Sequence, residues 1–361
     1  MQFLDRHRNR PLVIAEIGVN HNGSLDTGRR LIDAAIQAGA DAVKFQSFRA
    51  AELATAGAAK ARYQAEREPR AESQLEMLKR LELAPEDFRA LSAHCGERAI
   101  FLSTAFDSVY LDFLVGDLAM PAIKIASGEI TNGPLLLHAA RTGRPVLLST
   151  GMSMLQEVEQ ALALLAFGYL QPAGPPTRGA RPGSSAARKI LKDKVALLHC
   201  VSEYPCPTDQ ANLRAMHTLE QAFGLEVGYS DHTAGIAVAV AAATLGACVI
   251  EKHLTLDRNQ SGPDHLASLE PAEFAGMVVA IRTARAALGD GIKRPAPAEL
   301  PNRSVARRSL VAARAIAAGE VLAPDNLAAK RPGTGVSPME YWDRLGQRAR
   351  RAYAAEEPIE P

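Results

Sequence analysis

The sequence has no apolar run approaching the roughly 20 residues that a membrane-spanning helix needs. It also lacks an excess of one charge sign, since it holds 41 Lys and Arg residues against 40 Asp and Glu residues. Electrostatics therefore give no reason to expect nucleic acid or an anionic membrane as a partner. The first ten residues, MQFLDRHRNR, do not lead into the apolar segment of a signal peptide, so we expect a cytoplasmic protein.

Cysteine and aromatic residues are scarce. The four cysteines, Cys95, Cys200, Cys206 and Cys248, lack the paired spacing of zinc sites, and we expect reduced thiols in the core or in a pocket. Aromatic residues make up 5% of the chain, and none lies among the arginines of residues 171–188, QPAGPPTRGARPGSSAAR. We interpret this Pro- and Gly-rich segment as an exposed loop rather than as a nucleic-acid-binding one.

Short apolar runs alternate regularly with longer stretches of helical periodicity. The runs are PLVIAEIG (11–18), DAVKFQ (41–46), AIFLST (99–104), AIKIAS (122–127), PVLLST (145–150), VALLHC (195–200), LEVGYS (225–230) and ACVIEKH (247–253). Helical stretches include residues 26–40, 153–168, 233–247 and 270–289. The alternation predicts βα units on a parallel sheet. Eight units favour a closed (β/α)₈ TIM barrel, because IGVNHNG after the first run lacks the G-x-G-x-x-G spacing of an open dinucleotide-binding sheet.

The chain changes character after residue 289. Residues 290–303, DGIKRPAPAELPNR, are rich in proline and predict a linker between domains. Residues 304–361 carry short strand patterns and tight Gly and Pro turns, which predict a separate small β-rich domain. A domain of this size is marginal alone, so we expect it to pack against its own barrel, residues 1–289, or against a partner subunit.

Polar residues stand at the carboxyl end of every predicted strand, where barrel enzymes build their active sites. They are Glu16, Lys44, Gln46, Ser103, Thr104, Lys124, Ser127, Glu129, Ser149, Tyr204, Ser230, Asp231, His232, Glu251 and His253. One such residue would be a helix cap or a turn residue, but their coincidence at eight strand ends predicts a site.

Lys44 and Lys124 lie among apolar neighbours, and each buried ammonium needs an anionic partner. Together with the hydroxyls and the helix N-termini of the rim, they predict a cradle for phosphate and carboxylate groups. An internal salt bridge to Glu16 or Glu129 is the structural alternative, and in an empty enzyme it is compatible with the cradle.

His232 and His253 end adjacent strands, where two neutral imidazoles suit a divalent Lewis acid. Asp231 and Glu251 are the expected residues that orient the two rings. His21 is a weaker candidate, and for His199 a buried hydrogen-bonded role competes strongly.

The chain resembles the sialic acid synthase family over nearly its whole length. The resemblance rests on AEIGVNHNGSLDTG, GADAVKFQSF, FLSTAFD, IKIASGEITNGPLL, VLLSTGMS, LLHCVSEYPCP, VGYSDHTAG, VIEKHLTLD and SGPDHLASLEP. The segment SLVAARAIAAGEVLAPDNLAAKRPGTGVSP is similar to that family's C-terminal antifreeze-like (SAF) domain. The resemblance implies an enzyme that condenses phosphoenolpyruvate with an open-chain N-acyl sugar aldehyde and water, and releases phosphate.

The resemblance also assigns roles to individual residues. It implies that phosphoenolpyruvate is bound by Lys44, Thr104, Lys124, Ser127, Ser149 and Ser230, that Mn²⁺ or Mg²⁺ is bound by His232 and His253, and that the sugar is bound by Glu16, Gln46, Glu129, Tyr204, Glu251 and Asp264. Glu129 or Asp264 would assist proton transfer. Arg331 would reach the sugar's N-acetyl group from the other subunit of a domain-swapped homodimer. Ser202 stands where some members have Asn, which implies a shorter or water-mediated phosphate contact.

The sugar that we expect is N-acetylmannosamine, which gives N-acetylneuraminate. The alternative is 2,4-diacetamido-2,4,6-trideoxymannose, which gives N,N'-diacetyllegionaminate. The choice depends on whether the pocket accepts a hydroxyl or an acetamido group at C4 and a hydroxymethyl or a methyl group at C6.

Three other functions are weaker. A Schiff-base aldolase with Lys124 as nucleophile would need no metal and would release no phosphate. An ice- or glycan-binding module leaves the polar rim unexplained, and a metal-dependent hydrolase leaves the two lysines unexplained.

Overall fold

The computed structural model describes residues 10–67, 72–171, 173–175 and 184–361. Contacts within the chain divide it into two compact units on either side of the peptide bond between Gly289 and Asp290. Each unit has its own hydrophobic core.

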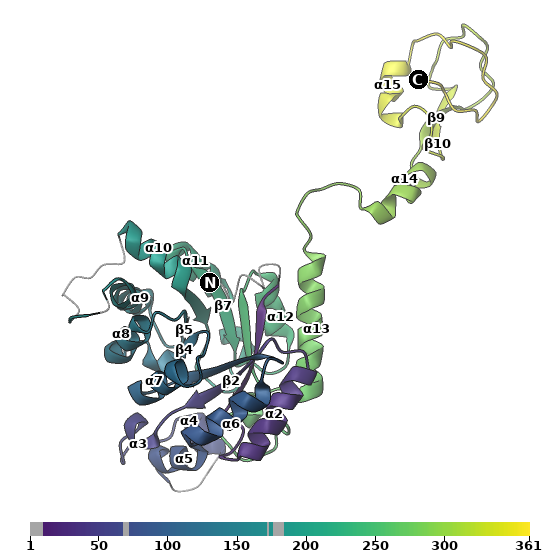
Figure 1. The fold of residues 1–361 in the computed structure, drawn as a ribbon. Helices are drawn as coiled ribbons and strands as arrows, with labels where there is room; N and C mark the ends of the chain where they lie inside the picture. The colour runs from purple at the N-terminus through teal and green to yellow at the C-terminus, as the bar shows by residue number, and fades with distance from the viewer. Residues whose placement is uncertain (1–9, 68–71, 172, 176–183) are drawn as a thin grey trace. The chain divides into compact units, whose positions relative to one another are not determined.

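The first unit is a closed barrel of eight parallel strands that pair in chain order (Figure 1). The strands are β1 (Leu12–Gly18), β2 (Ala42–Ser47), β3 (Ile100–Ala105), β4 (Ile123–Ile125), β5 (Val146–Ser149), β6 (Val195–His199), β7 (Glu226–Asp231) and β8 (Val249–His253). Each strand overlaps one of the eight apolar runs, so the predicted barrel is confirmed.

The side chains inside the barrel change from apolar to polar along the strands. Alternate residues of a strand face the same side, so Leu12 and Ile14 of β1 share the inner face with Glu16. The apolar members form a small inner core of Leu12, Ile14, Ala42, Leu102, Ala122, Leu147, Ala196, Leu198 and Val249. This core fills the barrel toward the amino ends of the strands and leaves the polar members at the carboxyl ends.

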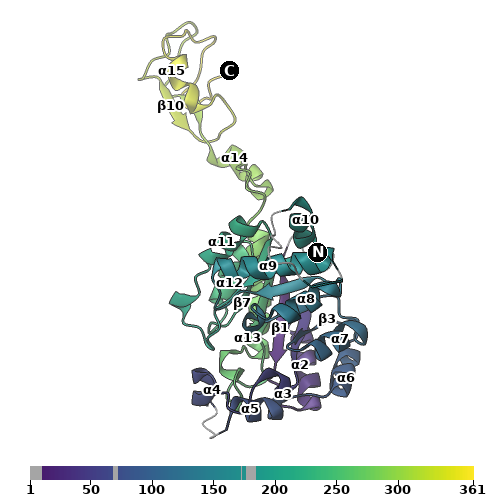
Figure 2. The same ribbon diagram turned by 90° about the vertical axis from the view of Figure 1, so that its left-hand side faces the viewer.

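Helices cover the outside of the barrel (Figure 2). Their inward faces form the larger core with the outward-facing strand residues. They are α2 (Leu25–Gln37), α6 (Pro85–Cys95), α7 (Ser108–Gly116), α8 (Gly133–Arg141), α9 (Leu155–Leu170), α10 (Ser185–Lys194), α11 (Arg214–Phe223), α12 (Ala237–Thr244) and α13 (Pro271–Ala287). The predicted helices 26–40, 153–168 and 270–289 correspond to α2, α9 and α13. The stretch 233–247 is helical only over α12, because residues 234–236 form a bend and residues 245–246 form a turn.

The connection from β2 to β3 is far longer than the usual βα or αβ loop of 2–6 residues. Besides α6 it contains three short helices, α3 (Ala50–Leu53), α4 (Arg62–Arg67) and α5 (Gln74–Leu81). Helix α5 begins with a capping box, in which Ser73 and Glu76 bond to each other's backbone N–H groups. We refer to α3, α4 and α5 as the excursion helices, and Figures 1 and 2 both place them together at one end of the barrel.

The last residues of the predicted loop 171–188 belong to a helix instead. Helix α10 begins at Ser185, because the Ser184 side chain accepts a hydrogen bond from the backbone N–H of Ala187 and caps the first turn. Residues 172 and 176–183 of the predicted loop lie outside the described residues.

The second unit, residues 290–361, is small and rich in turns and short strand pairings. Strands β9 (Ser309–Ala312) and β10 (Leu327–Lys330) form an antiparallel pair, which confirms the predicted small β-rich domain. Its core consists of Leu310, Ala312, Ile316, Leu322, Leu327, Val336, Ala349, Tyr353 and Ile359. The predicted linker 290–303 is not extended throughout, because helix α14 (Leu300–Ala306) occupies its end; the other helix of the unit is α15 (Tyr341–Arg344).

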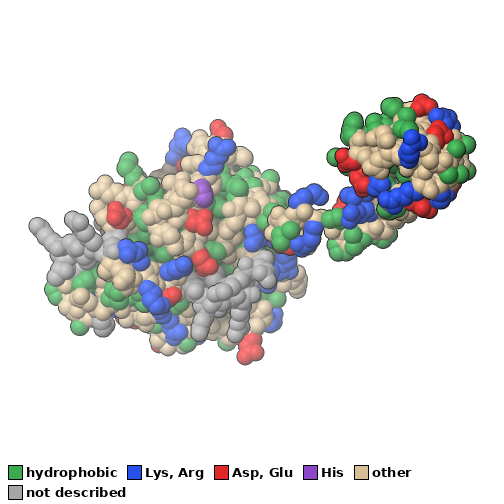
Figure 3. Space-filling model, turned by 90° about the horizontal axis from the view of Figure 1, so that it is seen from above, with side chains coloured by type: hydrophobic (Ala, Val, Ile, Leu, Met, Phe, Trp, Pro, Cys, Tyr) green, Lys and Arg blue, Asp and Glu red, His purple; other side chains and the backbone are tan. Residues whose placement is uncertain are grey.

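The absence of long apolar runs and the balance of charges, both noted in the sequence, have counterparts in the structure. In the part of the chain that the structure describes, no helix has the length and apolar character required to cross a membrane. On the face shown in Figure 3, Lys and Arg side chains are interspersed with Asp and Glu side chains on each unit.

Candidate active site

A cavity of about 400 Å³ opens at the carboxyl ends of the barrel strands. Of the site residues predicted on the barrel, all line it except Ser103, Glu129 and Asp231. Those that line it are Glu16, Lys44, Gln46, Thr104, Lys124, Ser127, Ser149, Ser202, Tyr204, Ser230, His232, Glu251, His253 and Asp264. The rim predicted from strand ends is therefore a single pocket.

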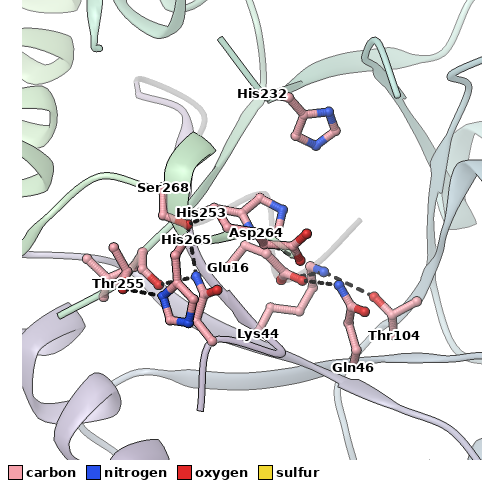
Figure 4. A network of polar contacts seen from close by, with 12 residues as sticks. Glu16, Lys44, Gln46, Thr104, His232, His253, Thr255, Asp264, His265 and Ser268 are labelled. Carbon is pink, nitrogen blue, oxygen red and sulfur yellow. Dashed lines mark hydrogen bonds and ion pairs between the residues drawn. The ribbon is translucent and has the colours of Figure 1, made fainter. Parts of the chain in front are cut away.

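Two lysines and two glutamates form the floor of this pocket, as Figure 4 shows for Lys44 and Glu16. The Lys44 Nζ atom lies 2.5 Å from Glu16 Oε2 and 3.7 Å from Glu251 Oε2. The Lys124 Nζ atom lies 3.3 Å from Glu251 Oε1. All four side chains are buried, so the internal salt bridge predicted for Lys44 with Glu16 exists, whereas the partner of Lys124 is Glu251.

Burial acts strongly on the protonation of these groups. Burial raises the pKa of Glu16 to about 7, although Lys44 opposes the shift. Burial also favours the neutral form of Glu251, but Lys124 and Lys44 outweigh it and lower the pKa of that carboxyl to about 2. The pKa of Lys124 is lowered by burial despite the nearby Glu251. The floor is therefore a set of coupled charges held away from water.

Hydroxyl groups surround the lysines. The Lys44 ammonium donates to Thr104 Oγ1 at 3.0 Å, and Ser230 Oγ donates to Glu251 Oε1 at 2.8 Å. Ser149 Oγ is buried without a hydrogen-bond partner, and a buried polar atom in this state needs a ligand or water. Ser103 does not belong to the cradle, because it faces the helix layer and its hydroxyl lies 2.6 Å from that of Ser47.

The predicted histidine pair is formed by His232, which directly follows β7, and His253, the last residue of β8. The ring centroids of His232 and His253 lie 5.7 Å apart. His232 Nδ1 lies 2.6 Å from the carbonyl oxygen of Val201, so Nδ1 carries the proton and Nε2 keeps its lone pair. Burial lowers the pKa of His232 to about 4 and lowers that of His253 well below its usual value. Both rings are therefore neutral, as metal ligands must be.

These residues fit a divalent ion with two protein ligands. His253 Nδ1 is buried without a hydrogen-bond partner, and Asp264 Oδ2 lies 3.9 Å from it (Figure 4). No group of three or more His, Cys, Asp or Glu residues arranged to hold a metal occurs among the described residues. Substrate and water oxygens would then supply the other coordination positions.

The prediction that Asp231 orients the histidines is wrong. Asp231 faces the helix layer, where its Oδ2 atom lies 2.8 Å from Lys252 Nζ and its Oδ1 atom accepts from Thr233. Val201, through its carbonyl oxygen, orients His232 instead. Glu251 contacts Ser230, whose hydroxyl lies 3.3 Å from His232 Nε2, so its influence on the ring is indirect.

Two other predicted residues lie elsewhere. Glu129 ends the 3₁₀ turn η1 (Ser127–Glu129), and its carboxylate accepts a 2.7 Å hydrogen bond from Asn132 rather than facing the cavity. Arg331 belongs to the second unit, and its role at the sugar stays a prediction. Asp264 is the predicted acid–base carboxylate that does line the pocket, and burial raises its pKa to about 7.

Residues of the long β2–β3 connection also line the cavity, and the sequence analysis missed them. They are Leu53, Ala61, Tyr63, Gln64, Gln74, Met77, Leu78 and Leu81. The Tyr63 ring lies 5.1 Å from the Tyr204 ring, which in turn lies 4.1 Å from the His232 ring. The only sequence signal was the length of this connection, because connections this long are often functional.

His199 and His21, the other two histidines considered as site candidates, have hydrogen-bonded positions within the fold. His199 Nε2 lies 2.9 Å from the carbonyl oxygen of Ala211, as expected for a hydrogen-bonded role. His21 is fully buried and accepts from the Gly23 N–H through Nδ1. The four cysteines form no disulfide, and among them Cys200 lines the pocket.

Comparison with known proteins gives relatives along nearly the whole chain. The N,N'-diacetyllegionaminic acid synthase of Campylobacter jejuni is 45% identical, over 96% of this chain and 98% of the relative. The synthase of the same name from Legionella pneumophila is 45% identical, over 93% of this chain and 89% of the relative. Among solved structures, the N-acetylneuraminic acid (sialic acid) synthetase of Leptospira borgpetersenii, in complex with citrate, is 32% identical with a TM-score of 0.65, covering 81% of this chain and 90% of that chain.

Family models agree with these matches and with the resemblance inferred from the motifs. The NeuB family model matches residues 31–293, and the SAF domain model matches residues 307–361. The chain therefore belongs to the NeuB family and carries a SAF domain at its C-terminal end.

Proposed function

We propose that this protein is an N,N'-diacetyllegionaminate synthase, which condenses phosphoenolpyruvate with open-chain 2,4-diacetamido-2,4,6-trideoxymannose and water and releases phosphate. The observation that carries the proposal is one cavity in which two buried lysines lie beside two neutral histidines. The lysines suit an anionic co-substrate, and the histidines suit the activation of a carbonyl group.

The choice of sugar rests on the comparisons. Both relatives at 45% identity are named N,N'-diacetyllegionaminic acid synthases, whereas the sialic acid synthetase of known structure is 32% identical. This difference favours the diacetamido sugar over N-acetylmannosamine, which the sequence motifs had put first. Both reactions use the same condensation chemistry, so the pocket floor is common to them.

Phosphoenolpyruvate would bind at the floor of the cavity. Lys44 and Lys124 would pair with its phosphate and carboxylate groups, and the hydroxyls of Thr104 and Ser149 would donate to the remaining oxygens. Ser149 Oγ is free to do so, because it has no partner within the protein. Low dielectric strengthens these charge-assisted bonds relative to water.

The enol carbon of phosphoenolpyruvate would then attack the aldehyde carbon of the sugar. A divalent ion, Mn²⁺ or Mg²⁺, bound by His232 and His253 would polarise the aldehyde oxygen. Glu16 and Gln46, which are hydrogen-bonded to each other at 3.2 Å, are placed to hold the sugar's hydroxyl groups near this point. Holding both reactants in one cavity supplies the orientation that the bond formation needs.

Water would next attack the carbon that carries the phosphate group. Asp264 would accept the proton of this water, because its carboxyl lines the cavity and its pKa of about 7 suits proton transfer at neutral pH. Glu129 is less suited, since its carboxylate is engaged with Asn132 outside the cavity. Carbon–oxygen cleavage then releases phosphate and leaves the new keto acid.

The SAF domain is proposed to complete the site in a domain-swapped homodimer. Arg331 from the second copy would contact the N-acetyl group of the sugar. Light scattering would give the oligomeric state, and mixing Arg331→Ala chains with Lys124→Met chains would restore activity if one active site uses both subunits.

Phosphate release from phosphoenolpyruvate with Mn²⁺ tests the proposal. We expect 2,4-diacetamido-2,4,6-trideoxymannose to react faster than N-acetylmannosamine, and EDTA to stop both reactions. Faster turnover of N-acetylmannosamine would make the protein a neuraminate synthase. Borohydride trapping of pyruvate on Lys124 without phosphate release would instead support the aldolase.

A further inference from the structure

An apolar cluster lines one side of the otherwise polar pocket. It consists of Val19, Phe48, Met77 and Leu81 together with the partly buried Leu53, Leu78 and Phe106, and we call it the apolar wall. It is separate from the cores inside and outside the barrel. Every member except Phe48 lines the cavity.

Phosphoenolpyruvate does not account for the apolar wall. That substrate is anionic, and the lysines and hydroxyls at the ends of the barrel strands suit it. A wall without hydrogen-bonding side chains favours an apolar group of the second substrate and disfavours a hydroxyl there.

The ring contacts indicate which end of the sugar meets the wall. The aldehyde carbon belongs near His232, and the rings of Tyr204 and Tyr63 continue from His232 toward the excursion helices. Tyr63 lies on α4, whereas Met77, Leu78 and Leu81 lie on the neighbouring α5. With the aldehyde carbon at His232, the far end of the sugar would lie among residues of the excursion helices.

Polar groups suited to an acetamido group lie beside the wall rather than within it. Gln64 and Gln74 line the same cavity; Gln64 Nε2 donates to the Tyr63 hydroxyl at 3.2 Å, and Gln64 Oε1 accepts from the backbone N–H of Ala61 at 2.9 Å. An acetamido group needs partners for both its N–H and its carbonyl oxygen, which glutamine side chains supply. A methyl group needs none.

We propose that the apolar wall binds the C6 methyl group of a 6-deoxy sugar and that Leu78 and Leu53 determine this specificity. The inference rests on the proposed function and adds the chemical feature that the pocket selects at C6. A 6-hydroxymethyl group in this place would leave its hydroxyl without a partner among Leu, Met and Phe side chains. Such a mismatch corresponds to a preference of roughly 10- to 100-fold in kcat/KM.

Two pairs of sugars test the inference, because each pair differs only at C6. The first pair is 2,4-diacetamido-2,4,6-trideoxymannose and its 6-hydroxy counterpart, and the second is N-acetylmannosamine and its 6-deoxy counterpart. We expect the full-length enzyme with Mn²⁺ to favour the 6-deoxy member of both pairs. Leu78→Gln should reduce this preference about tenfold in both pairs and leave the KM for phosphoenolpyruvate unchanged.

Leu75→Gln is the matched control, since Leu75 lies on the same helix, is also half-buried and does not line the cavity. It should leave the C6 preference intact. Leu53→Gln, on α3, provides a second test if Leu78→Gln does not fold. A wild-type enzyme without C6 preference, or a folded Leu78→Gln variant that keeps it, overturns the inference.

The failure of the proposed function would look different. In that case the enzyme would favour the C4 hydroxyl over the C4 acetamido sugars, while the preference for 6-deoxy members and its loss in Leu78→Gln would remain. Absence of turnover with all four sugars would refute the proposed function and this inference together.

Discussion

The buried ion pair between Lys252 and Asp231 joins β8 to β7 next to the histidine pair, and its contribution to stability can be measured. These two residues are paired in register on β8 and β7, and each directly precedes one of the histidines. Both side chains are fully buried behind the strands, with 2.8 Å between Lys252 Nζ and Asp231 Oδ2. We consider Lys252→Met, which removes the cation and keeps the length of the side chain.

The cost follows from the contacts that are lost. Asp231 Oδ1 keeps its hydrogen bonds from Thr233, at 2.9 Å and 2.8 Å, but Oδ2 and its charge lose their partner. Removing one partner of a buried ion pair costs about 3–5 kcal/mol. With about 2.1 cal/mol/K of unfolding entropy per residue, the unit that ends at Gly289 has about 0.6 kcal/mol/K, so Tm should fall by about 5–8 °C.

Calorimetry and denaturant unfolding of the metal-free protein would measure this change. The double variant Lys252→Met/Asp231→Asn should be less destabilised than Lys252→Met alone, because Asn keeps an acceptor for Thr233 without a buried charge. Lys189→Met is the matched control, since Lys189 pairs with Asp193 on the surface and such pairs contribute about 0–1 kcal/mol. If Lys252→Met costs no more than Lys189→Met, the reasoning about the buried pair is refuted.

Three further predictions concern the pocket and its surroundings. His253→Ala should abolish Mn²⁺-dependent phosphate release while circular dichroism stays unchanged, and full activity in this variant would exclude the metal site. Lys124→Met should raise the KM for phosphoenolpyruvate about 10- to 100-fold with a smaller effect on the KM for the sugar, as initial-rate kinetics would show. Burial lowers the pKa of His21 from 6.5 to about 4, so the unfolded chain binds more protons between these values and stability falls as the pH decreases from 6.5 to 4. Unfolding at a series of pH values should show that His21→Gln removes up to about 3 kcal/mol of this loss, and an unchanged slope would contradict the assignment.

The fold was predictable because each strand carries its own signal. Apolar runs such as VALLHC mark buried parallel strands, and the stretches between them have helical periodicity over α2, α9 and α13. The position of the site followed from the same pattern. Alternation along a strand puts Glu16 on the same face as Leu12 and Ile14, so the side chain of Glu16 faces the cavity.

The wrong predictions concern a residue on the opposite face of a strand, Asp231, and a residue beyond the end of a strand, Glu129. Asp231 and Lys252 are sequence neighbours of the histidines, and for that reason they face the opposite side of the sheet. Glu129 lies beyond the end of β4, where the 3₁₀ turn redirects its side chain toward Asn132. A residue close to the site in sequence therefore faces the cavity only if its own backbone, in the strand or in the segment after it, directs its side chain there.

The excursion helices could not be placed from the sequence for a different reason. Their residues have no strand register that fixes their direction, and Tyr63 lies in a helix of only six residues. Its position depends on packing against Tyr204, which is distant in the chain. Long-range contacts of this kind are set by the tertiary fold rather than by local pattern.

The two faces of β7 and β8 meet opposite physical demands. On the outer face, Lys252 and Asp231 have partners for their charges, which fixes the two strands against each other. On the inner face, His253 Nδ1 and, on nearby β5, Ser149 Oγ are buried without hydrogen-bond partners. An unpaired buried polar atom costs about 1–3 kcal/mol until a ligand or a water molecule supplies the missing bond. Replacing Ser149 by Ala should therefore stabilise the empty barrel and weaken the binding of phosphoenolpyruvate, because the same atom causes both effects.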